Sequence, residues 1–322
     1  MIHYDLIDSA RGINQLFRDR SGVLPSIETR RTNLPGILMD LNRLSDTAIK
    51  DFSNGRPLAA VDGSRVDYGE LYPYTICLMQ ALACSTQDGI ELSRAGIISP
   101  MAAETNESIQ KIMYERGMEE QEAYRRHLRE SLARVELELA IDIIHKCGPF
   151  LLMLDGGFLL FDRFPEWTAL VDSAQKSGCI LTGVIEEVAT AELYSRSEFQ
   201  TASQRVYDRE YLFGVLNQGE CLVMGNDQAI KRDYTTVFTR MGSVPQVIAF
   251  DFLAGQSGVI DKAMDFAYSL TPGQGRGIPA WLDMVDRRVR LSRKNVANLL
   301  FNTLEPSLRE KYLNPNRNRR GL

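Results

Sequence analysis

Two apolar runs that each end in an Asp-Gly pair constrain this chain more than any other feature of its sequence. Residues 58–63 carry Asp62 after the first run, and residues 151–156 carry Asp155 after the second. Short apolar runs predict buried strands, where a carboxylate is costly unless a cation or a hydrogen-bond donor meets it. One such pair alone would indicate a turn after a strand. Two copies predict neighbouring strands that bring two carboxylates together at their ends.

The composition is that of a globular protein with a large core. The chain has 322 residues, 44% of them hydrophobic and 25% charged, and a net charge of -5, which argues against a broad basic surface for nucleic acid. Five dispersed cysteines without CxxC spacing predict free thiols in a reducing compartment. The N-terminal segment lacks the pattern of a secretion signal, and no stretch reaches the roughly 20 apolar residues of a membrane span. We expect a cytoplasmic protein without membrane association.

Apolar periodicity and turn signals predict the order of the elements. We expect an N-terminal helical arm at residues 1–50, with helical pieces at 6–17 and 38–44, and a second unit at 51–322. That unit would begin with three consecutive antiparallel strands, the last two joined by a turn at Asp88 and Gly89. One long helix or two follow at 102–146. After it we expect a strand at 151–155, a helix at 167–176, a strand at 179–185, and further strands at 210–223 and 244–252.

The helix at 102–146 carries an acid on its apolar face. At about 100° per residue, Glu136 lies in the middle of the face formed by Leu132, Leu137 and Ile143, while Glu138 lies on the opposite side. A carboxylate on a packed face needs a partner, and a cation shared with the two strand acids would provide one. A surface ion pair is the alternative for Glu136.

A fourth acid lies in a short helix that is predicted after Pro279. Asp286 adjoins the apolar stripe of that helix, and Asp283 is its rival. Either acid could instead be an exposed partner of a neighbouring arginine such as Arg290. Beyond this helix, the polar and basic tail at 314–320 is typical of a disordered terminus, with DNA contact as the alternative.

Strand Asp, helix Glu, strand Asp and late helix Asp, in this order of elements, resemble the ribonuclease H-like fold, an α/β mixed sheet flanked by helices. Within that fold, the chain resembles the NurA family of DNA-end-processing nucleases. Three motifs carry the resemblance: AVDGS at 60–64, LxLDGG at 152–157 after the Glu-containing helix, and IPxxLxxxD at 278–286. Together they cover about residues 55–300.

The resemblance implies a manganese-dependent nuclease, with Mg²⁺ as the other cation of suitable chemistry. Its implied substrates are single- and double-stranded DNA ends, cleaved by 5′–3′ exonuclease and single-strand endonuclease action in double-strand break repair. The implied assembly is a homodimer that works with a HerA-type hexameric translocase. By motif, Asp62, Glu136 and Asp155 would be catalytic metal ligands, with Asp286 as the final ligand. Oxygen ligands without a Cys/His cluster suit Mn²⁺ or Mg²⁺ rather than zinc.

The chain departs from the family pattern at two places. Ile278 stands where some members have Tyr, and Glu186 and Glu187 stand in a strand where relatives often have Lys. A basic residue beside the metals would hold the phosphate and stabilise charge in the transition state. The alternative function is therefore a catalytically weak protein of the same fold that serves as a partner-binding subunit of a DNA translocase. The choice between DNA and RNA as substrate stays open.

Overall fold

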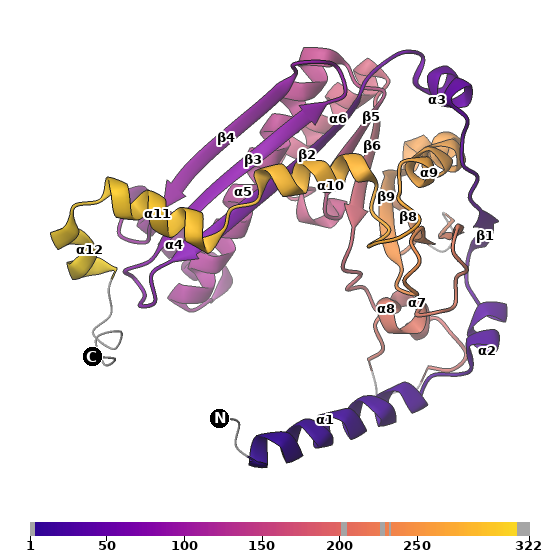
Figure 1. Cartoon of the computed structure of the whole chain (residues 1–322), viewed down its shortest axis with the longest axis horizontal. Coiled ribbons are helices and arrows are strands. Elements are labelled where there is room, and N and C mark those ends of the chain that lie inside the picture. Colours follow the sequence, from indigo (N-terminus) through magenta and orange to yellow (C-terminus); the bar gives the residue numbers. More distant parts are fainter. Residues whose placement is uncertain (1–3, 201–204, 226–228, 232, 314–322) are drawn as a thin grey trace.

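The strands of the described chain form one mixed sheet, seen in a computed structural model that describes residues 4–200, 205–225, 229–231 and 233–313 (Figure 1). The strand order is β1-β7-β8-β9-β6-β5-β2-β3-β4. The predicted tail at 314–320 lies outside the described residues. The strands are β1 (Ile37–Asp40), β2 (Leu58–Tyr68), β3 (Ile76–Ser85), β4 (Glu91–Ile98), β5 (Leu151–Asp155), β6 (Ile180–Ile185), β7 (Glu220–Val223), β8 (Tyr234–Arg240) and β9 (Ile248–Leu253).

The first half of the sheet follows the predicted order. β2, β3 and β4 are consecutive antiparallel neighbours, with the turn at Asp88 and Gly89 between the last two. β5 lies parallel to β2, and β6 lies parallel to β5. This confirms that the two Asp-containing strands are adjacent. It corrects one detail, because β2 does not end at Asp62 but continues to Tyr68, held by β3 along its length.

Helices cover both faces of the sheet, which confirms the α/β, ribonuclease H-like class of the fold. The long helical stretch is two helices, because Gly117 ends the first in a left-handed conformation (φ 62°). α5 packs on β2 and β3, while α10 packs on the same strands from the opposite face (Figure 1). The α-helices of the described residues are α1 (Tyr4–Gly22), α2 (Ile27–Thr32), α3 (Asp46–Ser53), α4 (Ala103–Arg116), α5 (Glu120–Cys147), α6 (Pro165–Ser177), α7 (Glu192–Ser195), α8 (Asp208–Tyr211), α9 (Ile260–Ser269), α10 (Ala280–Val289), α11 (Arg293–Thr303) and α12 (Pro306–Tyr312).

The N-terminal region is helical in α1, as expected, but the helix predicted at 38–44 is wrong. Residues Ile37–Asp40 form β1, which pairs antiparallel with β7 and joins this segment to the sheet. A short apolar run fits helical and extended spacing equally well, so the available partner strand decides. The division of the chain at residue 50 stays a prediction.

The later strands were predicted less well. Only Glu220–Val223 of the segment 210–223 is a strand, and Glu210 lies in α8. β9 (Ile248–Leu253) covers only the second half of the segment predicted at 244–252, and β8 was missed. β8 is buried on both faces, and its threonines bond inward: Thr236 to the Asp251 carboxylate and Thr239 to the Glu220 carbonyl, both at 2.9 Å. Such a strand has no apolar alternation for a sequence pattern to detect.

A close approach at Gly183 gives a stability prediction. A Cβ at Gly183 of β6 would lie 2.5 Å from the Gly156 carbonyl oxygen and 3.0 Å from the Phe158 ring. We expect Gly183→Ala to lower the free energy of unfolding by about 1–3 kcal/mol, because the turn after Asp155 must move. Urea denaturation measures this change. Gly96→Ala in β4 is the matched control, since a Cβ there meets nothing within 4 Å. Equal stabilities of the two variants would contradict the packing described here.

Candidate metal centre

Asp62 and Asp155 lie side by side on one face of the sheet. In the parallel pairing of β2 with β5, Val61 is the partner of Leu154, so each Asp follows a paired residue. Alternation along the strands turns both carboxyls toward the face that α10 covers. The two side chains are hydrogen-bonded to each other, and the Gly63 N–H donates to Asp62 Oδ1 at 2.6 Å. Asp62 is only 3% exposed, whereas Asp155 at the end of β5 is exposed, so the pair joins a buried carboxyl to one at the surface.

Glu136 approaches Asp62 and Asp155 from α5, on the other face of the sheet. Its side chain is buried, and a Cβ at Gly63 would overlap its carboxylate. The glycine of the AVDGS motif therefore gives Glu136 room to lie against the backbone of β2. Glu138 points away and forms an ion pair with Arg94 of β4, with 41% of its side chain exposed. This confirms that Glu136 faces the sheet, while Glu138 is partly exposed and pairs with the edge strand rather than pointing wholly to solvent.

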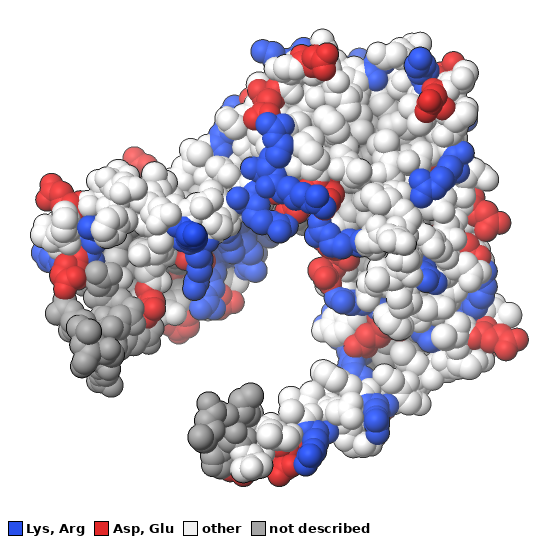
Figure 2. Space-filling model, in the orientation of Figure 1, with Lys and Arg blue, Asp and Glu red and all other residues white. Residues whose placement is uncertain are grey.

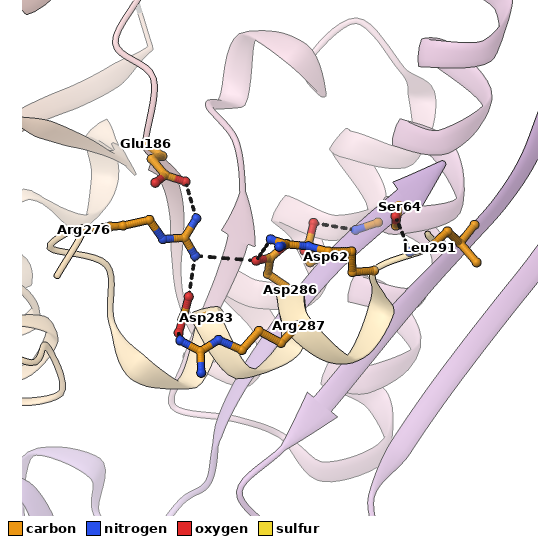
Figure 3. Close-up of polar contacts among 10 residues, drawn as sticks. Asp62, Ser64, Glu186, Arg276, Asp283, Asp286, Arg287 and Leu291 are labelled. Carbon is orange, nitrogen blue, oxygen red and sulfur yellow. Dashed lines mark hydrogen bonds and ion pairs between the residues drawn. The ribbon is translucent and has the colours of Figure 1, made fainter. Parts of the chain in front are cut away.

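Asp286 is brought to the site by the end of α10. The Leu291 N–H donates to Ser64 Oγ at 2.9 Å, which ties the chain after α10 to β2 beside Asp62 (Figure 3). Asp286 contributes to the electrostatic environment of both Asp62 and Asp155, whereas Asp283 forms ion pairs with Arg276 and Arg287. The geometry thus favours Asp286 over its rival as a member of the acidic cluster.

Arg276 was not singled out from the sequence, yet it lies at the centre of the charged contacts at this site. Its guanidinium bonds to Glu186 Oε2 at 3.0 Å and to the Asp283 carboxylate, and lies 3.5 Å from Asp286 Oδ2 (Figure 3). A lone arginine in the glycine-rich stretch before the IPxxLxxxD motif was the only signal available.

A buried ion pair behind the site was also missed. Lys231 Nζ donates to Asp251 Oδ1 at 2.6 Å, and Asp251 Oδ2 accepts the Phe158 N–H at 3.0 Å. Asp251 is fully buried in β9, and Lys231 is 6% exposed. Because Phe158 follows the Asp155-Gly-Gly turn, the pair fixes the backbone that leaves Asp155. The two residues are 20 positions apart in the chain. This separation is not a helical or strand spacing, so the sequence alone does not indicate the pair.

The pKa values of the three carboxyls at this site are raised. Burial, with the nearby charge of Asp155, raises the pKa of Asp62 to about 8. Burial, with the charges of Asp62 and Asp155, holds the pKa of Glu136 well above its usual range. Loss of hydration also raises the pKa of Asp155, with a contribution from Asp286. Crowded carboxyls of this kind become fully ionised only when positive charge meets them.

The donor set suits a hard divalent cation, although the side chains are not arranged around one. Among the residues that the structure describes, no three His, Cys, Asp or Glu side chains form a group that could hold a metal ion. Asp286 is instead engaged by Arg276 and Arg290. The site is nonetheless built from carboxylate oxygens alone, which is the ligand chemistry of Mg²⁺ and Mn²⁺.

The raised pKa of Asp62 gives a pH prediction. A carboxyl whose pKa is higher in the folded than in the unfolded state binds more protons when folded, so its contribution to stability is lost as pH rises. We expect the melting temperature of the protein in EDTA to fall between about pH 5 and pH 8. Asp62→Asn should make that fall smaller. Equal slopes for the variant and the wild type in thermal denaturation would contradict the shift.

The chain has a ribonuclease H-like sheet on which acids from two adjacent strands and a helix come close to one another. The NurA domain model matches residues 56–291, and the chain belongs to the NurA family. No curated protein matches it significantly.

Solved NurA structures share the fold at low sequence identity. The NurA nuclease of Sulfolobus solfataricus is 13% identical, with a TM-score of 0.58 over 95% of this chain and 99% of that one. A structure described as NurA with manganese is 11% identical, with a TM-score of 0.54 over 92% of this chain and 98% of that one. These likenesses concern the fold alone. Within the described ranges, no helix combines the length and apolarity of a bilayer span.

Proposed function

We propose that the protein is a metal-dependent deoxyribonuclease that processes DNA ends. The observation that carries this proposal is the meeting of Asp62, Asp155 and Glu136 from two strands and a helix, with protons held where cations would bind. Membership of the NurA family supports the nuclease activity. The finer activities, 5′–3′ exonuclease and single-strand endonuclease action in double-strand break repair, belong to this proposal.

Each of the four acids would bind metal from a different position. Asp62 and Asp155, already in contact, would share a cation between them, Glu136 would bind from the α5 side, and Asp286 would bind from α10. A bound divalent cation supplies an activated water and neutralises charge on the phosphate. Mn²⁺ is the first choice because a solved NurA structure contains manganese, and Mg²⁺ is the second. Turning Asp286 inward requires it to exchange its arginine partners for the cation.

The proposed assembly is a homodimer that acts with a HerA-type hexameric translocase in the cytoplasm. Helix α1 supports a partner, because none of its described residues is buried and large apolar side chains lie exposed on it. These side chains include Leu6 (62% exposed), Leu16 (60%) and Phe17 (60%). The long-range attraction of an acidic protein to DNA is weak, so a translocase that delivers the substrate would compensate for it.

Cleavage of labelled nucleic acids tests the activity. Wild-type protein is incubated with end-labelled single-stranded DNA, double-stranded DNA and RNA, each with Mn²⁺, Mg²⁺ or EDTA. We expect cleavage of DNA with Mn²⁺ and none with EDTA, together with a rise in melting temperature when Mn²⁺ is added. Cleavage of RNA alone would reassign the substrate.

The alternative is a catalytically weak subunit that binds a translocase. Glu186 at the end of β6 and Ile278 before α10 favour it, since neither supplies a basic or hydroxyl group to the phosphate. In that case, DNA would stay intact with every metal. Mn²⁺ would also leave the melting temperature unchanged.

A further inference from the structure

Arg276 is an arginine that the fold places among the acids of the site. It contacts acids from two elements, Glu186 at the end of β6 and both Asp283 and Asp286 of α10. It also lies close enough to Asp155 to act on its charge. A guanidinium offers five N–H donors in a planar fork and stays charged at any physiological pH. The site therefore already holds a cationic group of the kind that recognises phosphate.

The loop that carries Arg276 is built to hold it in place. Gly275 (φ 120°) and Gly277 (φ 82°) on either side adopt backbone conformations that other residues rarely do. The loop packs on Gly242, where a Cβ would lie 2.7 Å from the Gly275 carbonyl oxygen. The anchored backbone directs Arg276 toward the acids, while 46% of its side chain stays open to solvent.

The surroundings of Arg276 suit a polyanion. Figure 2 shows blue side chains gathered around a small red patch at the deepest part of the concave side, over α10 in Figure 1. Arg287 of α10 and Arg290, which directly follows that helix, are among the exposed arginines here, at 73% and 59%. This local positive charge contrasts with the net charge of -5 of the whole chain. A phosphate backbone would find its positive partners beside the acids rather than over the surface at large.

Divalent cations would change what Arg276 contacts. Without them, its guanidinium is shared among three carboxylates. Cations bound by Asp155 and Asp286 would neutralise these carboxylates, and the attraction between Arg276 and the acids of α10 would become weaker. A phosphate oxygen beside the cations offers the released donors a bidentate acceptor.

We propose that Arg276 contacts the phosphate backbone of the nucleic-acid substrate next to the bond that is cut. This inference rests on the proposed function and names the residue that binds the substrate at that site. The end of β6 carries Glu186 and Glu187 and offers the phosphate no basic group. Arg276 would supply that group instead.

DNA binding by Arg276→Gln tests the inference. Affinity for a single-stranded oligonucleotide is measured by fluorescence anisotropy over a series of salt concentrations, with Ca²⁺ in place of Mn²⁺ to prevent turnover. We expect the affinity to fall by about tenfold to a hundredfold, because a charge-assisted bidentate contact is lost. The slope of log K against log salt should become shallower by about 0.7, the contribution of one phosphate contact on a single strand. A purely structural role would not change this slope by that amount.

Arg94→Gln is the matched control. Arg94 of β4 is likewise shared between two carboxylates, Glu138 and Asp142, and is 43% exposed, but it lies on the opposite face of the sheet. Its variant should bind DNA with the affinity and salt slope of the wild type. Arg276→Lys keeps the charge without the fork, so we expect a wild-type slope with reduced affinity. This variant decides the matter if Arg276→Gln does not fold.

The outcomes separate this inference from the proposed function. If the wild type cleaves DNA but Arg276→Gln binds it with unchanged affinity and slope, the role of Arg276 is wrong and the nuclease stands. If the wild type binds no DNA, both are wrong. A weaker affinity with a shallower slope in Arg276→Gln, and a retained rise in melting temperature with Mn²⁺, supports a phosphate contact that is separate from metal binding.

Discussion

Asp62→Asn is expected to lower the rate of DNA cleavage by about a thousandfold or more. The substitution replaces a carboxyl that is hydrogen-bonded to Asp155 with a neutral amide of nearly the same shape. An amide does not supply the negative charge that draws cations to the site, so the water would not be activated. Single-turnover cleavage of labelled DNA in Mn²⁺ measures the loss.

Folding should survive this change. Because the pKa of Asp62 is about 8, its carboxyl is already protonated at neutral pH without metal, and the amide replaces an uncharged group. Asp142→Asn is the control, since Asp142 lies on α5 and pairs at the surface with Arg94. It should cleave at the wild-type rate. Undiminished cleavage by pure Asp62→Asn protein would end the mechanism.

Glu136→Gln is expected to change activity and stability in opposite directions. Removing the carboxylate that binds from α5 should lower cleavage by about a hundredfold or more. The same change relieves a buried acid that is forced to keep its proton beside Asp62 and Asp155. We therefore expect the metal-free protein to gain about 1–3 kcal/mol in free energy of unfolding at pH 8. Urea denaturation in EDTA measures the gain.

Glu138→Gln, two residues further along α5, is the matched control. It removes a half-exposed ion pair with Arg94, which is worth at most about 1 kcal/mol. Cleavage should stay at the wild-type rate, and stability should stay level or fall slightly. Loss of cleavage in Glu138→Gln with full activity in Glu136→Gln would mean that the wrong acid of the helix has been assigned to the site.

The acids of the site could be predicted because local sequence determines their positions. A strand pattern sets which face Asp155 points to, and helical spacing alone separates Glu136 from Glu138. The extent of β2 could not be predicted in the same way, because its continuation past Asp62 depends on pairing with β3. The edge strand β1 likewise depends on β7, whose paired residues lie 180 to 186 positions further along the chain.

The charged residues around the acids escaped prediction for a related reason. Arg276 reaches Glu186 across 90 positions in sequence, and Lys231 meets Asp251 across 20. Such contacts arise only when strands and loops from separate segments pack together. A carboxylate at the end of an apolar run is conspicuous, whereas an arginine or lysine in a loop has no pattern that distinguishes it from a solvated charge.

The position of bound manganese tests the central claim most directly. Crystals grown with Mn²⁺ would be measured at a wavelength where manganese scatters anomalously. We predict a peak within ligand distance of the carboxylates of both Asp62 and Asp155, on the α10 face of the sheet. The Glu136 carboxylate should be coordinated or hydrogen-bonded to a coordinated water. Manganese found elsewhere, or absent from these two carboxylates at saturating concentration, would contradict the account.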